Sequence, residues 1–391
     1  MLTNGSRWIV SPLLIALITV AASSQGGSGE TRSFKVSPGA SVIFALESGG
    51  SVTVIGWDKP EAEVTYTQGG MGDGHVVEIS EVHGDLLVES KMAGHGERSG
   101  SLEFEVYVPH EFDVQLESLG GSLELRELKG RFSGTTMGGG ITLTRVEGVA
   151  RLTTMGGEVT VTDCDIDGYI KTMGGEVLMK DVVGYLDASS MGGDVRYVNV
   201  RDREGDIRAS GGLLARGLDE GTVTITTMGG DIEVDDAPAG AVVHTMGGDI
   251  KIVNADRLVK AKTLGGSIEI DIHEGWVKAM TMAGDIDVTV AEGLGGGSEG
   301  IILESMSGDV TLTIPSGLDA KFDLMIAYTR NSRKDYEIKS NLDLEITRSD
   351  EWDYNDGTPK KRIHAKGVMG RGSIPIRIET VNGDIHVDLT D

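Results

Sequence analysis

A five-residue word, Met-Gly-Gly-acid-aliphatic, recurs through the middle of the chain and constrains its fold more than any other feature. The second glycine of the word recurs at a step of about 18 residues, with a single slip of one position near a degenerate copy at Gly211, and looser copies follow at Gly308 and Gly383. A constant period of this length indicates stacked units of one structure, which is a solenoid. The regular positions are Gly121, Gly139, Gly157, Gly175, Gly193, Gly230, Gly248, Gly266 and Gly284.

Each unit has the pattern of strands. Apolar and polar residues alternate after the glycines, so that Val159 and Val161 share one face, as do Ile250 and Ile252, and we expect these faces to be core. A further glycine often follows nine residues later, as at Gly148, which predicts at least two strands and two corners per rung. Glycine suits such corners because it adopts positive φ without steric cost. The predicted fold is all-β, a single-stranded parallel β-helix of about 18 residues per rung, with three faces and a right-handed coil favoured.

The chain divides into four expected segments. Residues 1–24 form a signal peptide, because Arg7 precedes an apolar run of about 15 residues, shorter than the roughly 20 that span a bilayer. A retained membrane anchor is the alternative. Residues 25–118 form an N-terminal β cap, 119–314 the regular repeats, and 315–391 a C-terminal β region and cap. Irregular caps are expected since open strand edges at the ends of a solenoid would pair with other chains.

Charge and composition exclude several classes of protein. The chain has 35 Lys and Arg against 61 Asp and Glu, a net charge of -26, which repels nucleic acids and anionic lipid surfaces. Its 58 Gly and 8 Pro lack a collagen period, and 39% hydrophobic residues exclude wholesale disorder. Cys164 is the single cysteine, which predicts a buried, inert thiol and no intramolecular disulfide. Between residues 321 and 377 the balance reverses to 12 basic against 9 acidic residues, so we expect charge polarity along the molecule.

Several motifs resemble a known family. They are Val52-Thr53-Val54-Ile55-Gly56-Trp57-Asp58, Tyr107-Val108-Pro109, the repeated Gly-Asp-Ile or Gly-Asp-Val, and the closing run from Ile378 to Ile385. Over nearly all of the mature chain, the sequence is similar to the bacterial putative-adhesin family of β-strand-repeat domains of unknown function. The resemblance implies an exported, single-stranded β-helix with an adhesin-like role, and the family offers no catalytic residues.

Residues of equal phase stack into columns in such a fold, and a methionine column is the first. Its members share the alternation of the inward valines, so we interpret them as core or corner packing. Neighbouring thioethers would also suit Cu(I), although Leu119 and Leu264 interrupt the column. The methionines are Met137, Met155, Met173, Met191, Met228, Met246, Met282 and Met306.

The acidic and hydroxyl columns carry the other polar chemistry. Carboxylates one rung apart repel, which a calcium ion would relieve, and Asp231, Asp249 and Asp285 are weak candidates as its ligands. Turn formation and solubility explain the acids more simply, so we expect neither a metal site nor a cofactor. Hydrogen-bonded stacking explains the Thr and Ser that precede each methionine better than an ice-binding array does.

No catalytic signature stands out, since every rung carries similar acids and the eight His show no metal-ligand spacing. We therefore expect an exported, non-enzymatic, adhesin-like binding or structural module of the bacterial cell envelope, located in the periplasm, at the cell surface or outside the cell. Its expected partner is an envelope or surface polysaccharide or protein. The alternative is a carbohydrate-active enzyme of β-helix fold. Trp352, Asp353 and Tyr354, in the acidic stretch from Asp350 to Asp356, are the candidate ligand contacts.

Overall fold

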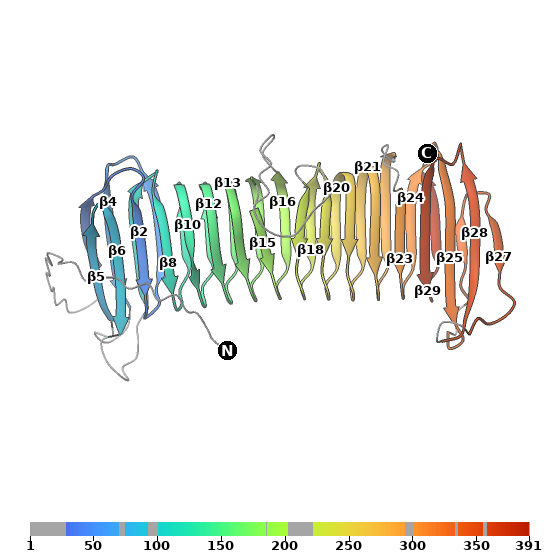
Figure 1. The fold of residues 1–391 in the computed structure, drawn as a ribbon, viewed down its shortest axis with the longest axis horizontal. Helices are drawn as coiled ribbons and strands as arrows, with labels where there is room; N and C mark the ends of the chain where they lie inside the picture. The colour runs from blue at the N-terminus through green and yellow to red at the C-terminus, as the bar shows by residue number, and fades with distance from the viewer. Residues whose placement is uncertain are drawn as a thin grey trace, which may run out of the picture.

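The computed structural model describes residues 29–69, 75–92, 101–184, 186–201, 222–293, 300–332, 335–354 and 358–390. Within these ranges every regular element is a β-strand, and all strands join one hydrogen-bonded sheet system, which confirms the all-β class. The strands stand side by side along one long axis (Figure 1). These ranges hold no helix long and apolar enough to cross a bilayer. The expected signal segment and the degenerate copy at Gly211 lie outside the described residues.

The strands fall into an irregular group at each end and a repetitive group between them. The first group is β1 (Glu30–Lys35), β2 (Ser41–Leu46), β3 (Ser51–Trp57), β4 (Glu61–Gln68), β5 (His75–Val82), β6 (Asp85–Met92), β7 (Leu102–Pro109) and β8 (Asp113–Ser118). The middle group is β9 (Leu123–Arg126), β10 (Lys129–Thr136), β11 (Ile141–Thr144), β12 (Glu147–Thr154), β13 (Val159–Thr172), β14 (Val177–Val183), β15 (Leu186–Ser190), β16 (Val195–Arg201), β17 (Val223–Thr226), β18 (Ile232–Ala237), β19 (Ala241–His244), β20 (Ile250–Lys262), β21 (Ile268–Thr281), β22 (Ile286–Gly293), β23 (Ile301–Ser305) and β24 (Val310–Pro315). The last group is β25 (Ala320–Thr329), β26 (Ile338–Ser340), β27 (Glu345–Arg348), β28 (Lys360–Met369), β29 (Ile374–Val381) and β30 (Ile385–Thr390).

The repeat of the sequence is a parallel register in the structure. Ile141 pairs with Val159, and Val159 pairs with Val177, so each pairing advances along the chain by the same step as the glycine word. The register continues from Ile232 to Ile250 and on to Ile268. Side chains of one type therefore stack one strand spacing, about 4.8 Å, apart.

Each repeat contributes to two rows of strands. The first row follows the glycine word and contains β9, β11, β14, β16, β18, β22 and β24 with the first halves of β13, β20 and β21. The second row contains β10, β12, β15, β17, β19 and β23 with the second halves of those three long strands. The structure thus divides most repeats into two named strands rather than the three faces favoured from the sequence.

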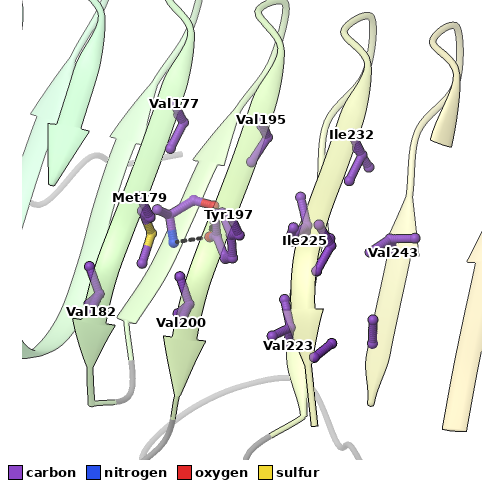
Figure 2. Packing of buried hydrophobic residues seen from close by; sticks show 14 of the residues in the cluster. Val177, Met179, Val182, Val195, Tyr197, Val200, Val223, Ile225, Ile232 and Val243 are labelled. Carbon is purple, nitrogen blue, oxygen red and sulfur yellow. Dashed lines mark hydrogen bonds between the residues drawn. The ribbon is translucent and has the colours of Figure 1, made fainter. Parts of the chain in front are cut away.

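The two rows enclose one apolar core. Val159, Val161, Ile250 and Ile252 are buried as expected from their alternation. Figure 2 shows side chains of both rows in this core, such as Val195 of the first row and Ile225 of the second. Tyr197 of the first row donates its hydroxyl hydrogen to the Ala188 carbonyl oxygen of the second row at 2.7 Å. The small Ala188 side chain lies beside the large Tyr197 ring, so a small residue in one row makes room for a large residue in the other. Cys164 is buried as expected.

The glycine of the word is required by close approach between rungs. A Cβ on Gly157 would lie 2.1 Å from the carbonyl oxygen of Gly139, and its φ is not in the left-handed region. The reason expected from the sequence, positive φ, is therefore wrong for this position. The expectation is confirmed at Gly148, Gly184 and Gly275, the glycines nine residues after the word, which do have positive φ. Positive φ also occurs at non-glycine residues near the end of the first-row segment, namely Glu127, Arg145, Asp163, Asp181, Asn199, Asp236 and Asn254. Asn and Asp tolerate this conformation better than most residues do.

A further rung begins near the N-terminus, which the sequence reading missed. A Cβ on Gly121 would meet the carbonyl oxygen of Gly50 at 2.2 Å, and β3 pairs with β9 in parallel, Val52 facing Leu123. The signal was present, because Gly49-Gly50-Ser51-Val52 matches Gly120-Gly121-Ser122-Leu123. These two segments are 71 residues apart, as are Ser51 and Ser122, whose side-chain hydroxyl and backbone N–H are hydrogen-bonded. Because the regular words are about 18 residues apart, their period does not predict this rung.

The order of strands along the molecule differs from chain order at both ends. At the N-terminal end, β2 pairs with both β6 and β8, and β3 with both β7 and β9. At the C-terminal end, β29 lies between β23 and β25, and β30 lies between β24 and β26. β2, β3, β29 and β30 are therefore hydrogen-bonded on both edges, whereas β1 pairs with β4. The antiparallel strands β4, β5, β27 and β28 stand near the ends of the array (Figure 1).

Candidate functional site

The hydroxyl column is buried at the corner before each glycine word. Thr154 Oγ1 donates a hydrogen bond to the Gly139 carbonyl oxygen at 2.7 Å, and Thr245 Oγ1 makes the same bond to Gly230 at 3.0 Å. The hydroxyls thus bind the backbone of the preceding rung instead of facing water. Thr136, Thr172, Ser190, Thr227, Thr263, Thr281, Ser305 and Thr380 repeat the contact.

Within the acidic column, the aspartates form a ladder of hydrogen bonds from one rung to the next. The Asp249 backbone N–H donates to Asp231 Oδ1 at 2.7 Å, and Asp249 Oδ1 in turn accepts from the Ser267 N–H at 2.7 Å. Asp285 Oδ1 accepts from the Asp309 N–H at 2.8 Å. Hydrogen bonds with a charged acceptor are stronger than neutral ones, so these carboxylates stabilise the stacking of the rungs.

This ladder includes all three of the calcium candidates, Asp231, Asp249 and Asp285. Each has one carboxylate oxygen engaged with a backbone N–H of the next rung. In the part of the chain that the structure describes, no group of three or more His, Cys, Asp or Glu has a geometry that would hold a metal ion. A structural role accounts for the aspartates, and calcium binding stays a sequence-based prediction.

The methionine column is exposed, and our interpretation of it as core packing was wrong. Met155 is 43% exposed and Met306 is 54% exposed, with the other column methionines between these values. The cause is a change of alternation at the corner: Thr154 points inward with the second row, and Val159 points inward with the first row. Met155, which follows Thr154, therefore points outward. The glycines beside each methionine carry no side chain that would cover it.

The candidate ligand contacts differ in exposure. The Trp352 ring packs edge-on against Tyr328 with centroids 6.0 Å apart, and Lys361 Nζ stands 5.3 Å from the Trp352 ring centroid. Asp353 accepts a hydrogen bond from Arg362 Nη1 at 2.6 Å. Tyr354 is 64% exposed. Among the three candidates, Tyr354 presents the most surface to a ligand, and Asn355 and Asp356 of the same stretch lie outside the described residues.

The carboxyl groups with a lowered pKa are scattered over different elements. A hydrogen bond from Tyr66 holds the pKa of Glu30 below its usual value, and one from Arg145 does the same for the pKa of Glu127. A hydrogen bond with His364 lowers the pKa of Asp323. Each shift has its own local partner, so these three carboxyl groups do not form the converging acid and base pair that a glycosidase needs.

Comparison with known proteins adds little to this picture. No family model matches the chain, and no curated protein matches it. Among solved structures, the chain is similar to a "putative cell adhesion protein" from Clostridium sporogenes, with 10% identity, 93% of this chain and 100% of that chain covered, and a TM-score of 0.18. A TM-score this low establishes no common fold, so the likeness carries no argument about function.

Proposed function

We propose that the described strands form a single-stranded parallel β-helix, coiled in the right-handed sense, with one turn for about every 18 residues. The parallel register at the step of the glycine word supports this proposal. The proposed segments are the signal peptide at 1–24, the N-terminal cap at 25–118, the regular rungs at 119–314 and the C-terminal cap at 315–391. From β5 to β27 the strands follow one another in sixteen steps, so at about 4.8 Å per step the array is roughly 77 Å long.

This rod acts, in our proposal, as an exported, non-enzymatic, adhesin-like binding or structural module of the bacterial cell envelope. The observation that carries it is the surface along the glycine words, on which an exposed methionine and an acidic residue recur in most of the described rungs. Such a surface suits an extended partner, which would be an envelope or surface polysaccharide or protein. Export rests on the predicted signal peptide alone, and the location is the periplasm, the cell surface or the medium.

Affinity capture from envelope fractions and on glycan arrays tests this function. The bait is the chain from residue 25 onward, compared with a variant lacking residues 350–356 and with the point variant Tyr354→Ala. Tyr169→Ala is the matched control, because Tyr169 is an exposed ring in the middle of the array. Retention of one envelope component by the parent and by Tyr169→Ala, with loss in the other two variants, supports the proposal. Absence of any retained component contradicts it.

The enzymatic alternative gives a different result. If the chain is a carbohydrate-active enzyme, it shortens a polysaccharide, and new reducing ends appear with time. Incubation with the same glycans, followed by measurement of reducing ends, distinguishes cleavage from binding. Release of reducing ends by the purified chain would replace our proposal with the enzyme.

A further inference from the structure

A groove lies where the methionine column approaches the C-terminal end of the array. It has a volume of about 450 Å³, and Met280, Met282, Met306 and Met325 all line it. Met282 and Met306 occupy the same place in consecutive rungs, since Thr281 pairs with Ser305 and the Met306 N–H donates to the Thr281 carbonyl oxygen at 3.1 Å. These two side chains are 51% and 54% exposed.

A third thioether joins this pair from the same face. Met280 lies two residues before Met282, and alternation along a strand places side chains two residues apart on one face. In the other described rungs of the column, the residue two before the methionine is Thr135, Thr153, Lys171, Ser189, Thr226, His244 or Glu304. Methionines such as Met137, Met155 and Met173 also follow one another from rung to rung, but among the described column positions a thioether two residues before the column methionine occurs at this groove alone. Met325 lies farther off, because Glu304 and Glu379 stand between it and Met280 in the ladder.

The spacing of the rungs suits one metal ion held between thioethers. Paired strands are about 4.8 Å apart. A metal–sulfur bond is about 2.3 Å long, so two sulfur atoms on opposite sides of one ion are about 4.6 Å apart. Methionine is unbranched and has three rotatable side-chain bonds, which lets the sulfur atoms converge without movement of the backbone. The backbone itself is held by the Thr281 and Ser305 hydroxyls, which bind the carbonyl oxygens of Gly266 and Gly284.

The chemistry of these ligands selects a soft cation. Thioethers are soft and uncharged, and they favour Cu(I) over the hard ions that prefer oxygen. Met280 has Glu304 on one neighbouring strand and Lys262 on the other. Glu379, next along, is hydrogen-bonded by Arg377 Nε at 2.8 Å. These nearby charges largely balance, while the net charge of -26 on the whole chain attracts cations.

We propose that the thioethers of Met280, Met282 and Met306 together bind one soft monovalent cation, Cu(I), in this groove. Carbohydrate or protein binding elsewhere on the rod is independent of this site. The interruption of the column by Leu264 sets one boundary of the site, and Val381, which follows Thr380 on the next rung, sets the other.

Titration with Ag(I), a redox-inert analogue of Cu(I), tests the proposal by calorimetry. Every protein carries Cys164→Ala, so that the thiol does not compete for the ion. The test variant is Met280→Leu/Met282→Leu/Met306→Leu, and the matched control is Met137→Leu/Met155→Leu/Met173→Leu, which removes as many thioethers from the same column. Leu and Met have similar volumes, so thermal melts are expected to show that all variants stay folded.

The expected result is one equivalent of Ag(I) bound by the parent and by the control. The test variant should bind about 10- to 100-fold more weakly or not at all, because the loss of even an outer partner weakens metal sites by that factor. X-ray absorption of the Ag(I)- and Cu(I)-loaded parent should show sulfur neighbours. Absence of binding by the parent, undiminished binding by the test variant, or equal losses in both triple variants would each overturn the site.

Discussion

At the scale of single residues, the close spacing between rungs depends on glycines, which have no Cβ atom. Gly157 brings its α-carbon so close to the Gly139 carbonyl oxygen that a Cβ would stand 2.1 Å from it. A Cβ on the preceding Gly156 would have its nearest neighbour, the Met137 carbonyl oxygen, 4.0 Å away. The two glycines of the word therefore have different roles, although the sequence shows them as a pair.

Alanine substitutions should separate these roles. We expect Gly157→Ala to lower the free energy of unfolding by about 1–3 kcal/mol, because the added methyl group overpacks the contact between rungs. Gly156→Ala is the control and should change stability little. Denaturant titration measures both. Equal effects of the two substitutions would contradict the close-approach explanation.

The aspartate ladder makes a second prediction for single residues. Asp249→Asn keeps an oxygen that accepts the Ser267 N–H, whereas Asp249→Ala removes the acceptor. We expect Asn to preserve stability and Ala to cost about 0.5–1.5 kcal/mol, the usual net value of one hydrogen bond. Melting with calcium and with a chelator should give one midpoint. A midpoint raised by calcium in the parent, and not in Asp249→Asn, would establish the calcium site.

At the scale of elements, a phenol and a carboxylate reinforce the antiparallel pairing of strand β1 with β4. Tyr66 of β4 donates a hydrogen bond to Glu30 Oε2 of β1 at 2.8 Å. Partial burial, followed by this hydrogen bond, raises the pKa of Tyr66 to about 12 from its usual value of 10.0. The folded state therefore favours the neutral phenol more than the unfolded state does.

A pH dependence follows with a definite sign. Because the pKa of Tyr66 is higher in the folded state, its contribution to stability is complete below about pH 10 and is lost as the pH rises towards about 12. We expect Tyr66→Phe to flatten that alkaline fall in the thermal midpoint. Tyr354→Phe, which alters an exposed phenol, should leave the fall unchanged. An identical alkaline profile for parent and Tyr66→Phe would disprove the assignment.

The repeat itself can be tested as an element. Deletion of residues 159–176 removes one full step of the register and joins Glu158 to Val177, which takes the place of Val159. We expect a folded array shortened by about 4.8 Å, since every side chain keeps its face. Deletion of residues 159–167 removes half a step and should abolish cooperative unfolding. Circular dichroism and small-angle scattering compare the two. Equal tolerance of both deletions would contradict a structural unit as long as the repeat.

At the scale of the whole molecule, both ends of the array close in the same manner. Near the N-terminus β2 and β3, and near the C-terminus β29 and β30, are paired on both edges, because the strands of β4–β7 and β25–β28 extend the array beyond them. An arrangement of this kind keeps the regular rungs from presenting open edges to other molecules.

Truncation tests this closure. Removal of residues 315–391 strips β29 from β23 and β30 from β24 and leaves two unpaired parallel edges. We expect the truncated chain to associate with increasing concentration, as light scattering coupled to size exclusion would detect. The variant lacking only residues 350–356 keeps β29 and β30 and should match the parent. A truncated chain in the same state as the parent would show that these strands do not protect the edges.

The sequence by itself determined the strand class, the step of the repeat and the inward valines and isoleucines, because these depend on alternation between near neighbours and on a repeated word. Only the tertiary structure decided which residues form the other features. The methionines face outward because the alternation changes at a corner, and Gly50 joins the glycine column from a distant part of the chain. The grouping of Met280, Met282 and Met306 in one groove likewise depends on which rungs adjoin. Contacts between rungs, rather than local pattern, set these features.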